Sequence, residues 1–315
     1  MVEEVEKGLS RVTFSLPLGI DHVHCYLVRS SNGGFLLIDT GLGSRDPEKR
    51  WRPVLDELDA PIEAIVVTHM HPDHVGGARD VAELTGAPVY QGRIDHAQCA
   101  LAWGQRNPRL FADYWASHGM PRDTIEGIVT DSGRLVDAVH WVERPDRLLD
   151  AGDEVDGWRV HVLPGHADGH IVLERDDVVL AGDTILTGIT PAIGLYPNSR
   201  PDPLGDYLES LRWYEEHAPR VAYTGHREPV TDPAGRAGEI AEHHAHRLDR
   251  TEAALDGAPL SAYDVSLALF EDDLSSTLRR FATAEALAHL ERLVREGRAT
   301  RAGLAYVRAG DTMEA

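Results

Sequence analysis

The chain has 315 residues, enough for one large domain or two ordinary ones and for a sizeable buried core. Apolar residues make up 42% and charged residues 26% of it, which excludes a disordered chain, and the 2 cysteines exclude a disulfide scaffold. Acidic residues outnumber Lys and Arg by 52 to 31, so the net charge is −21. Such a surface repels nucleic-acid phosphates and anionic lipid, which makes a nucleic-acid partner unlikely.

The cysteines and the N-terminal segment predict the compartment. Cys25 and Cys99 are expected to be free thiols, as in a reducing environment. Residues 1–10 are acidic and lack the apolar core of a signal peptide. No window approaches the ~18 consecutive apolar residues of a membrane span. We therefore expect a cytoplasmic protein with no membrane partner.

The first third of the sequence alternates strand-like and helix-like segments. Strands are predicted at 12–14, 23–28, 34–39, 64–67 and 88–90. Helices are predicted at 51–58 and 74–84, where apolar residues recur at helical spacing. Later strands are predicted at 158–163, 171–174, 178–181 and 221–223. This alternation indicates the α/β fold class.

Residues 93–145 interrupt the alternation with a helical pattern that carries several aromatic residues. Two interpretations stay open for this insertion. Its aromatic side chains either pack on the body of the protein or form a lid that contacts substrate.

From residue 238 the pattern changes to helices at 240–255, 261–269 and 283–296, followed by a strand pair near 299 and 306. We predict a winged-helix-like domain at 238–315 after a catalytic domain at 1–237. Winged helices often bind DNA, but residues 248–315 hold 8 Arg and no Lys against 12 acidic residues, a local net charge of −4. The basic footprint of a DNA reader is missing. A packing or dimerisation role is expected instead, with a homodimer as the candidate assembly.

The most informative segment is a histidine-rich turn directly after the strand at 64–67. It places His69, His71, Asp73 and His74 within six residues. Imidazole and carboxylate groups are the usual zinc ligands where thiolates are absent. The first two side chains are expected to aim at one ion, and the last two at a second.

Three later strands each end in a further ligand type. These residues are His166, Asp183 and His226. Ligands gather at the carboxyl ends of strands in open α/β sheets, and a carboxylate can bridge two ions. His170 follows His166 by four residues, and we take it as a candidate catalytic residue that hydrogen-bonds a ligand or substrate. A structural turn histidine is the alternative for His170.

Two other groups of histidines are expected to have structural roles. His243, His244 and His246 point in different directions on a helix, so they are predicted to form a solvated helix face. His22 and His24 share one side of an early strand, where they either border the pocket or are structural.

In this order, the histidine and aspartate motifs resemble the metallo-β-lactamase-fold hydrolase superfamily over residues 10–235. The resemblance implies a four-layer αβ/βα sandwich with the metals at one edge. It assigns the first ion to His69, His71 and His166. It assigns the second ion to Asp73, His74 and His226, with Asp183 as the bridge. The turn at 38–41 resembles the family's first motif, in which Asp39 is supportive.

The whole chain most resembles the β-lactamase-like protein 2 group, which adds a C-terminal winged helix and includes ribonucleases and carrier-protein thioesterases. Neither cysteine is near a ligand motif, which disfavours lactam hydrolysis of the B1 class. His71 stands where flavodiiron oxygen reductases have Glu, which disfavours that branch. Arg227 follows the last ligand, where the family has Gly.

The implied activity is hydrolysis through a metal-bound hydroxide, with Asp73 as a catalytic residue that orients it. Two Zn²⁺ per chain are expected, with iron or manganese as alternatives. The preferred substrate is a thioester, lactone or related small acyl compound, free or carrier-bound. A ribonuclease or phosphodiesterase on the same site is one alternative, and a mononuclear-iron sulfur dioxygenase is a second. A binding module with an inactive site is a further reading, which the complete ligand set disfavours.

Overall fold

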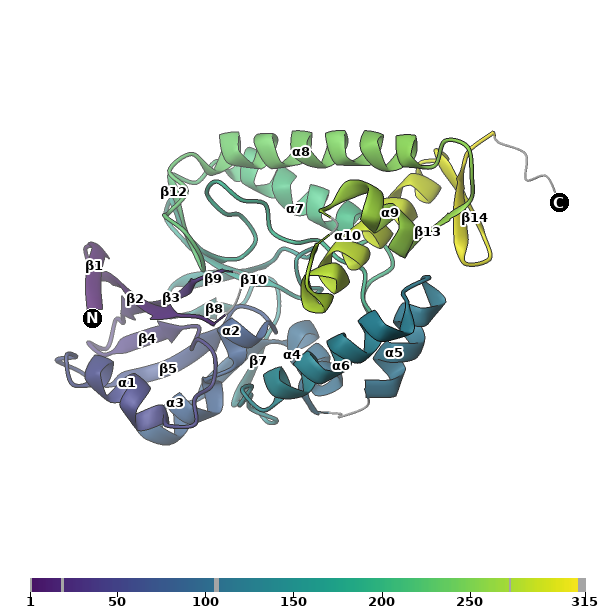
Figure 1. Cartoon of the computed structure of the whole chain (residues 1–315). Coiled ribbons are helices and arrows are strands. Elements are labelled where there is room, and N and C mark those ends of the chain that lie inside the picture. Colours follow the sequence, from purple (N-terminus) through teal and green to yellow (C-terminus); the bar gives the residue numbers. More distant parts are fainter. Residues whose placement is uncertain (1, 18–19, 105–107, 272, 311–315) are drawn as a thin grey trace. The chain divides into compact units, whose positions relative to one another are not determined.

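The computed structural model describes residues 2–17, 20–104, 108–271 and 273–310. Figure 1 shows the course of the chain, which divides into two compact units. The first unit comprises residues 1–105, 134–191 and 217–236, and the second comprises 106–133, 192–216 and 237–315. The expected domain boundary between 237 and 238 stays a prediction.

The first unit is built on two mixed β-sheets. The seven-stranded sheet follows chain order: β1 (Val2–Glu6), β2 (Leu9–Ser15), β3 (His22–Arg29), β4 (Phe35–Ile38), β5 (Ile62–Val67), β6 (Val89–Gly92) and β7 (Arg147–Leu149). Strands β1 to β4 pair antiparallel, and β4 to β7 pair parallel. The five-stranded sheet has the order β12 (Val221–Thr224), β11 (Val178–Gly182), β10 (Ile171–Arg175), β9 (Trp158–Val162) and β8 (Glu154–Val155).

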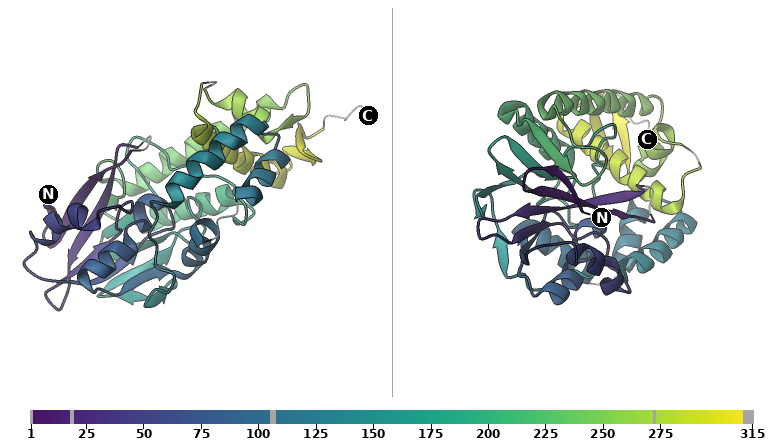
Figure 2. Two further views of the ribbon diagram at one scale, coloured as in Figure 1. Left: turned by 60° about the horizontal axis from the view of Figure 1, so that its bottom comes forward. Right: turned by 90° about the vertical axis from the view of Figure 1, so that its left-hand side faces the viewer.

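Side chains of the seven-stranded sheet alternate between two hydrophobic cores. In β3, Cys25 and Leu27 pack in the core that also contains residues of the helices, whereas Tyr26 and Val28 face the core shared with the five-stranded sheet. This is the two-residue period of a strand that is buried on both faces. The two sheets therefore lie face to face, and helices cover the outer side of the larger one (Figure 2). The expected α/β class is confirmed.

The helices of the first unit are α1 (Pro47–Leu55), α2 (Pro72–Val75), α3 (Ala78–Thr85), α4 (Arg93–Cys99) and the π-helical turn η1 (Ala100–Gly104). The single helix predicted at 74–84 is wrong, because α2 and α3 are separated at Gly76 and Gly77. A Cβ at Gly76 would lie 2.1 Å from the Pro72 carbonyl oxygen, and one at Gly77 would lie 2.6 Å from the Thr40 carbonyl oxygen. Close backbone packing therefore requires glycine at this break.

The second unit is mainly helical. It contains α5 (Pro108–Ser117), most of α6 (Arg122–Val136), α7 (Pro203–His217), most of α8 (Pro233–Ala254), α9 (Ala262–Leu269) and α10 (Ser276–Arg295). A small sheet has the order β13 (Leu260–Ser261), β15 (Ala305–Arg308) and β14 (Ala299–Ala302). The three C-terminal helices and the final strand pair match the predicted pattern. In the described part of the chain, no helix combines the length and apolar character needed to cross a bilayer.

The predicted solvated histidine face is wrong for His244. This residue lies on the buried stripe of α8 with Ile240 and Leu248, at the spacing that faces a core. Its Nδ1 lies 3.2 Å from Nε2 of His289 on α10, whose ring is also buried. Burial lowers the pKa of His244 to about 2 and that of His289 to about 4.

The second unit is expected to lose stability in mild acid because of this histidine pair. Both pKa values are depressed on folding, so the unfolded chain binds more protons as the pH falls from about 6.5 towards 4. From pH 7 to pH 5 the expected loss is about 2 kcal/mol per histidine. Denaturant unfolding at both pH values measures it. His289→Gln should reduce the pH dependence of the unfolding free energy, and exposed His246→Gln should leave it unchanged. If the unfolding free energy changed equally between pH 7 and pH 5 in the wild type and both variants, the pH dependence would not come from this histidine pair.

Candidate metal centre

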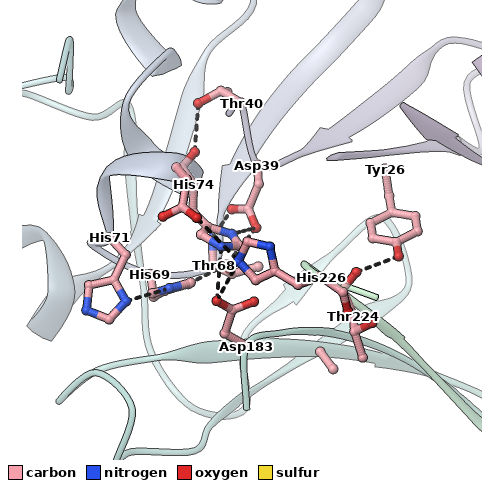
Figure 3. Close-up of polar contacts among 12 residues, drawn as sticks. Tyr26, Asp39, Thr40, Thr68, His69, His71, His74, Asp183, Thr224 and His226 are labelled. Carbon is pink, nitrogen blue, oxygen red and sulfur yellow. Dashed lines mark hydrogen bonds and ion pairs between the residues drawn. The ribbon is translucent and has the colours of Figure 1, made fainter. Parts of the chain in front are cut away.

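The predicted ligands all belong to the first unit and come from loops that follow strands. His69, His71, Asp73 and His74 lie after β5 and on α2, and His166 lies between β9 and β10. Asp183 follows β11, and His226 follows β12. Figure 3 shows most of these side chains converging on one point. The structure thus brings together all seven residues predicted to hold metal.

Three imidazoles form the first set of converging ligand atoms. His71 Nδ1 lies 3.1 Å from His69 Nε2 and 2.8 Å from His166 Nε2. In a tetrahedral zinc site with Zn–N bonds of about 2.0–2.1 Å, ligand nitrogens lie roughly 3.3 Å apart. Burial lowers the pKa of His71 to about 3 and also depresses that of His69. Both rings therefore stay neutral with lone pairs available for a cation.

The second set consists of Asp73, His74 and His226. His226 Nε2 lies 3.3 Å from Asp73 Oδ2 and 3.1 Å from Asp183 Oδ2. His74 Nε2 lies 3.3 Å from the same Asp183 oxygen, and His166 Nε2 of the first set lies 3.6 Å from it. The Asp183 carboxylate is thus next to ligands of both sets, which is the position of a bridging group.

The hydrogen bonds made by His74 and His226 show that this centre suits a cation. His74 Nδ1 lies 2.7 Å from Asp39 Oδ2, and His226 Nδ1 lies 2.6 Å from the His22 carbonyl oxygen. Both partners only accept, so each ring carries a proton at Nδ1 and, when neutral, a lone pair at Nε2. Those lone pairs face the Asp183 carboxylate. His74 Nε2 and Asp183 Oδ1 are also buried with no hydrogen-bond partner among the described residues.

The electrostatics of the second set agree with cation binding. Burial opposes protonation of His226, but the Asp183 carboxylate outweighs it and raises the pKa of the ring to about 10. Burial likewise opposes protonation of His74, and Asp183 and Asp39 raise its pKa above the ordinary range. A site that attracts protons in this way binds a metal ion in their place, with release of those protons. The His/Asp cluster fits a dinuclear metal site.

Asp39 orients ligands of both sets from behind the centre (Figure 3). Its Oδ1 accepts from Thr68 N, and its Oδ2 accepts from Thr68 Oγ1, both at 2.8 Å. Thr68 Oγ1 lies 3.0 Å from His69 Nδ1, and Asp39 Oδ2 also accepts the hydrogen bond from His74 Nδ1 that is described above. Asp39 has a left-handed backbone with φ 61°, which aspartate tolerates better than most residues. It is the supportive residue that the resemblance implied.

His170 contacts the main chain with both ring nitrogens. Its Nε2 accepts from Asp183 N at 3.0 Å, so its Nδ1 carries the proton and donates to the Ile171 carbonyl oxygen at 3.0 Å. The ring stacks on His69 with centroids 4.3 Å apart. In this structure His170 positions Asp183 and His69, and the expected catalytic roles of His170 and Asp73 stay predictions.

His22 and His24 support the last ligand loop. The backbone N–H of Arg227 donates to His22 Nε2 at 3.1 Å, and His24 Nε2 lies 3.0 Å from the Arg227 carbonyl oxygen. These contacts hold Arg227 in a left-handed conformation, with φ 65°. This geometry supports the structural interpretation of His22 and His24.

Asp95, at the start of α4, is a buried carboxylate that sequence reasoning missed. One oxygen accepts from Met70 N at 2.8 Å, and the other accepts from Gly169 N at 2.6 Å. Asp95 therefore ties the loop of His69 and His71 to the loop of His166. In the sequence, Asp95 is a lone aspartate near the start of a helix. Such a residue cannot be told apart from an ordinary capping residue, so the sequence does not indicate its role.

Asp95→Asn is expected to weaken metal binding about tenfold and to destabilise the fold by about 1–3 kcal/mol. The amide keeps one acceptor oxygen but points an N–H₂ group at a backbone donor, so one buried hydrogen bond is lost. Chelator competition and denaturant unfolding measure the two effects. Asp56→Asn, at an exposed aspartate of the same unit, is the matched control. Equal metal affinity in both variants would contradict the role given to Asp95.

Comparison with known proteins agrees with this geometry. The model of the metallo-beta-lactamase superfamily matches residues 18–226, and the model of the metallo-beta-lactamase-like C-terminal domain matches residues 248–305. The chain belongs to the metallo-beta-lactamase superfamily and has its additional C-terminal domain. With its His/Asp cluster it is a metal-dependent hydrolase of that superfamily. The narrower assignment to the protein 2 group stays a prediction.

Two solved structures are similar over nearly the whole chain. The metallo-beta-lactamase family protein TTHA1429 of Thermus thermophilus is 34% identical, with a TM-score of 0.85 over 97% of this chain and 100% of that one. A beta-lactamase domain protein of Burkholderia ambifaria is 28% identical, with a TM-score of 0.86 over 98% and 94%. The probable metallo-hydrolase YqjP of Bacillus subtilis is 28% identical over 272 residues, covering 81% of this chain and 82% of its own.

Two further relatives carry a bound metal or an activity in their names. The protein TTHA1623, solved in a di-iron-bound form, is 26% identical, with a TM-score of 0.50 over 73% of this chain and 98% of that one. The atrochrysone carboxyl ACP thioesterase of Emericella nidulans is 27% identical over 216 residues, or 66% of this chain. The chain spans about half of that relative, 52% of its length.

Proposed function

We propose that this protein hydrolyses a thioester, lactone or related small acyl substrate, free or attached to a carrier, at a pair of Zn²⁺ ions. The observation that carries the proposal is the pair of three-ligand sets beside Asp183, in a chain whose net charge is −21. Iron and manganese are the alternative metals, and the di-iron-bound relative makes iron the first of these. The thioesterase relative supports the acyl substrate class.

Each part of the cluster has a role in this proposal. His69, His71 and His166 would hold one ion. Asp73, His74 and His226 would hold the other, with Asp183 touching both. When bound, such ions lower the pKa of water towards ~7 and polarise a substrate carbonyl. Asp39 and His170 keep the ligand rings and the Asp183 carboxylate oriented, so the centre does not have to reorganise during the reaction.

Charge separates the acyl hydrolase from a nuclease on the same metals. A nuclease must attract a polyanion, and its track of Lys and Arg releases counterions from the phosphate backbone. This chain has 21 more acidic than basic residues, so its long-range field opposes that encounter. The proposed partner is thus a small or carrier-bound acyl compound in the cytoplasm, and the candidate assembly is a homodimer, which light scattering tests.

A single experiment tests the chemistry. The purified protein is analysed for metal content and then assayed against a thioester, a lactone, RNA and bis-p-nitrophenyl phosphate. We expect two zinc ions per chain and turnover of the thioester or lactone. His69→Ala and Asp73→Ala should each abolish that turnover, because each removes a ligand from one set.

Other outcomes would replace the proposal. Preferential cleavage of RNA or of the phosphodiester would support the phosphodiesterase. One iron per chain with persulfide oxidation would support the sulfur dioxygenase. Activity that survives both alanine substitutions would place the catalytic site elsewhere.

A further inference from the structure

The loop that carries His226 is held by two hydroxyl groups, which Figure 3 shows beside it. This His226 loop comprises residues 224–227 and begins at the last residue of β12. Tyr26 on β3 donates its hydroxyl to the Thr224 carbonyl oxygen at 2.7 Å. The Thr224 hydroxyl in turn donates to the His226 carbonyl oxygen at 2.8 Å. Neither side chain belongs to a ligand set, so any effect on the metal centre must pass through the loop.

Both hydroxyl groups belong to buried side chains, so water does not compete for their hydrogen bonds. Thr224 is 0% exposed and Tyr26 is 3% exposed. Burial raises the pKa of the Tyr26 hydroxyl above its ordinary value, so this group keeps its proton and donates. A buried carbonyl that loses its donor is left unsatisfied, which is costly. The two hydrogen bonds therefore favour one position of the His226 loop.

The backbone of the His226 loop packs directly against ligand side chains. A Cβ added at Gly225 would lie 2.4 Å from Asp183 Oδ1 and 2.5 Å from His74 Cε1, so only glycine fits beside these two side chains. Gly225 N also donates to the Gly182 carbonyl oxygen at 2.8 Å, directly before Asp183. Because close-packed interiors transmit small shifts, a displacement of the loop moves His226 and crowds Asp183 and His74.

Other hydrogen bonds of the His226 loop act on different groups. His226 Nδ1 donates to the His22 carbonyl oxygen at 2.6 Å, which orients the imidazole. His24 N donates to the Gly225 carbonyl oxygen at 2.7 Å. The two hydroxyls bind the carbonyl groups of the residues before and after Gly225. Three successive carbonyls are thus anchored, and the hydroxyls are the anchors that a substitution can remove without changing a ligand.

We propose that Tyr26 and Thr224 are positioning residues that set the affinity of the second ligand set for its metal ion. Loss of either hydroxyl allows the His226 loop to shift, and the His226 ring then leaves the position in which its Nε2 lies 3.3 Å from Asp73 Oδ2. The first set consists of three imidazoles from other loops, so its affinity should change less. The inference rests on the two-ion centre of the proposed function.

Competition between the full-length protein and a chelator for Zn²⁺ tests the proposal, because it resolves the affinities of the two ions. Thr224→Val removes the hydroxyl and keeps the branched shape of the side chain, so the affinity of the second set should fall about tenfold. Tyr26→Phe should lower the same affinity about fivefold. Thr224→Ser keeps the hydroxyl and should retain most of the affinity. Asp73→Ala, which lacks a ligand, identifies the affinity that belongs to the second set.

Two variants that each lose one hydroxyl elsewhere in the first unit are matched controls. Thr85→Val removes a hydroxyl that donates to the Val81 carbonyl oxygen at 2.7 Å, and Tyr223→Phe removes one that donates to Glu6 at 2.9 Å. Both variants should bind both zinc ions as the wild type does. A merely structural role of Tyr26 and Thr224 would lower the unfolding free energy of their variants without a selective loss of one ion.

Unchanged affinities for both ions in Thr224→Val and Tyr26→Phe would overturn the proposal, as would an equal loss for both ions. If circular dichroism shows that Thr224→Val is unfolded, Tyr26→Phe decides by the same comparison.

The same measurements separate this inference from the proposed function. Two ions and acyl hydrolysis in the wild type, with unchanged affinities in the variants, would remove this inference alone. A selective loss of the second ion in the variants of a protein without acyl hydrolysis would remove the acyl-hydrolase assignment alone. A wild type that binds one ion would remove the two-ion centre, and this inference with it.

Discussion

Replacing Asp183 by alanine is expected to abolish hydrolysis and to lower the bound metal from two ions per chain to at most one. Its Oδ2 lies 3.1 Å from His226 Nε2, 3.3 Å from His74 Nε2 and 3.6 Å from His166 Nε2, so one carboxylate contacts both ligand sets. Its loss leaves the two ions without the anion between them. Because bound metal supplies several kcal/mol of transition-state stabilisation, kcat/KM should fall at least about a thousandfold.

The Asp183 variant has two useful controls. Asp183→Asn keeps the size of the side chain and one acceptor oxygen but removes the charge, so it should lose nearly as much activity and retain more of the fold. Asp56→Ala, at an exposed aspartate, should behave as wild type. Elemental analysis and steady-state kinetics on the favoured substrate measure both effects. More than about a tenth of wild-type activity in Asp183→Ala would exclude Asp183 from the centre.

Removal of the metal is expected to inactivate the protein and to lower its melting temperature by roughly 10 °C. Without a cation, the Nε2 atoms of His74 and His226 must either take protons or face the Asp183 carboxylate unpaired. Metal that is present at about a thousand times its Kd also stabilises the folded state by about 4 kcal/mol. Thermal melts with and without chelator measure the shift, and adding zinc back should restore activity.

The Asp183→Ala variant is the matched control for the chelator experiment. Its centre holds less metal from the start, so the same chelator should shift its melting temperature by less than it shifts that of the wild type. An unchanged melting temperature and full activity in protein shown by elemental analysis to be metal-free would contradict a metal centre. Loss of activity alone, with no change in melting temperature, would mean that the metals serve catalysis without stabilising the fold.

Local patterns fail at short edge elements and at one helix. They do not predict the strands β1, β7 and β8, because few alternating apolar residues mark them. The helix α7 is also missing from the prediction, although its buried residues Leu204, Tyr207, Leu211 and Tyr214 recur at helical spacing, so its signal is present in the sequence. The helix predicted at 74–84 is divided at Gly76, where the cause is the carbonyl of Pro72 one turn earlier. His244 is expected in solvent but occupies the core stripe of α8, because the partner that shields it is His289, 45 residues away.

The sequence by itself determined the α/β class and the set of candidate metal ligands that the fold brings together, because strand ends and ligand spacing are local features. Four ligand types in six residues leave few other interpretations, and His166, Asp183 and His226 each directly follow a strand pattern. Only the tertiary structure decided which ring nitrogen of His74 and His226 carries the proton. The acceptors of these protons, Asp39 and the His22 carbonyl oxygen, come from other parts of the chain. The tertiary structure alone revealed Asp95, which is hydrogen-bonded to two ligand loops. These depend on contacts between residues far apart in the chain, which spacing along the sequence does not encode.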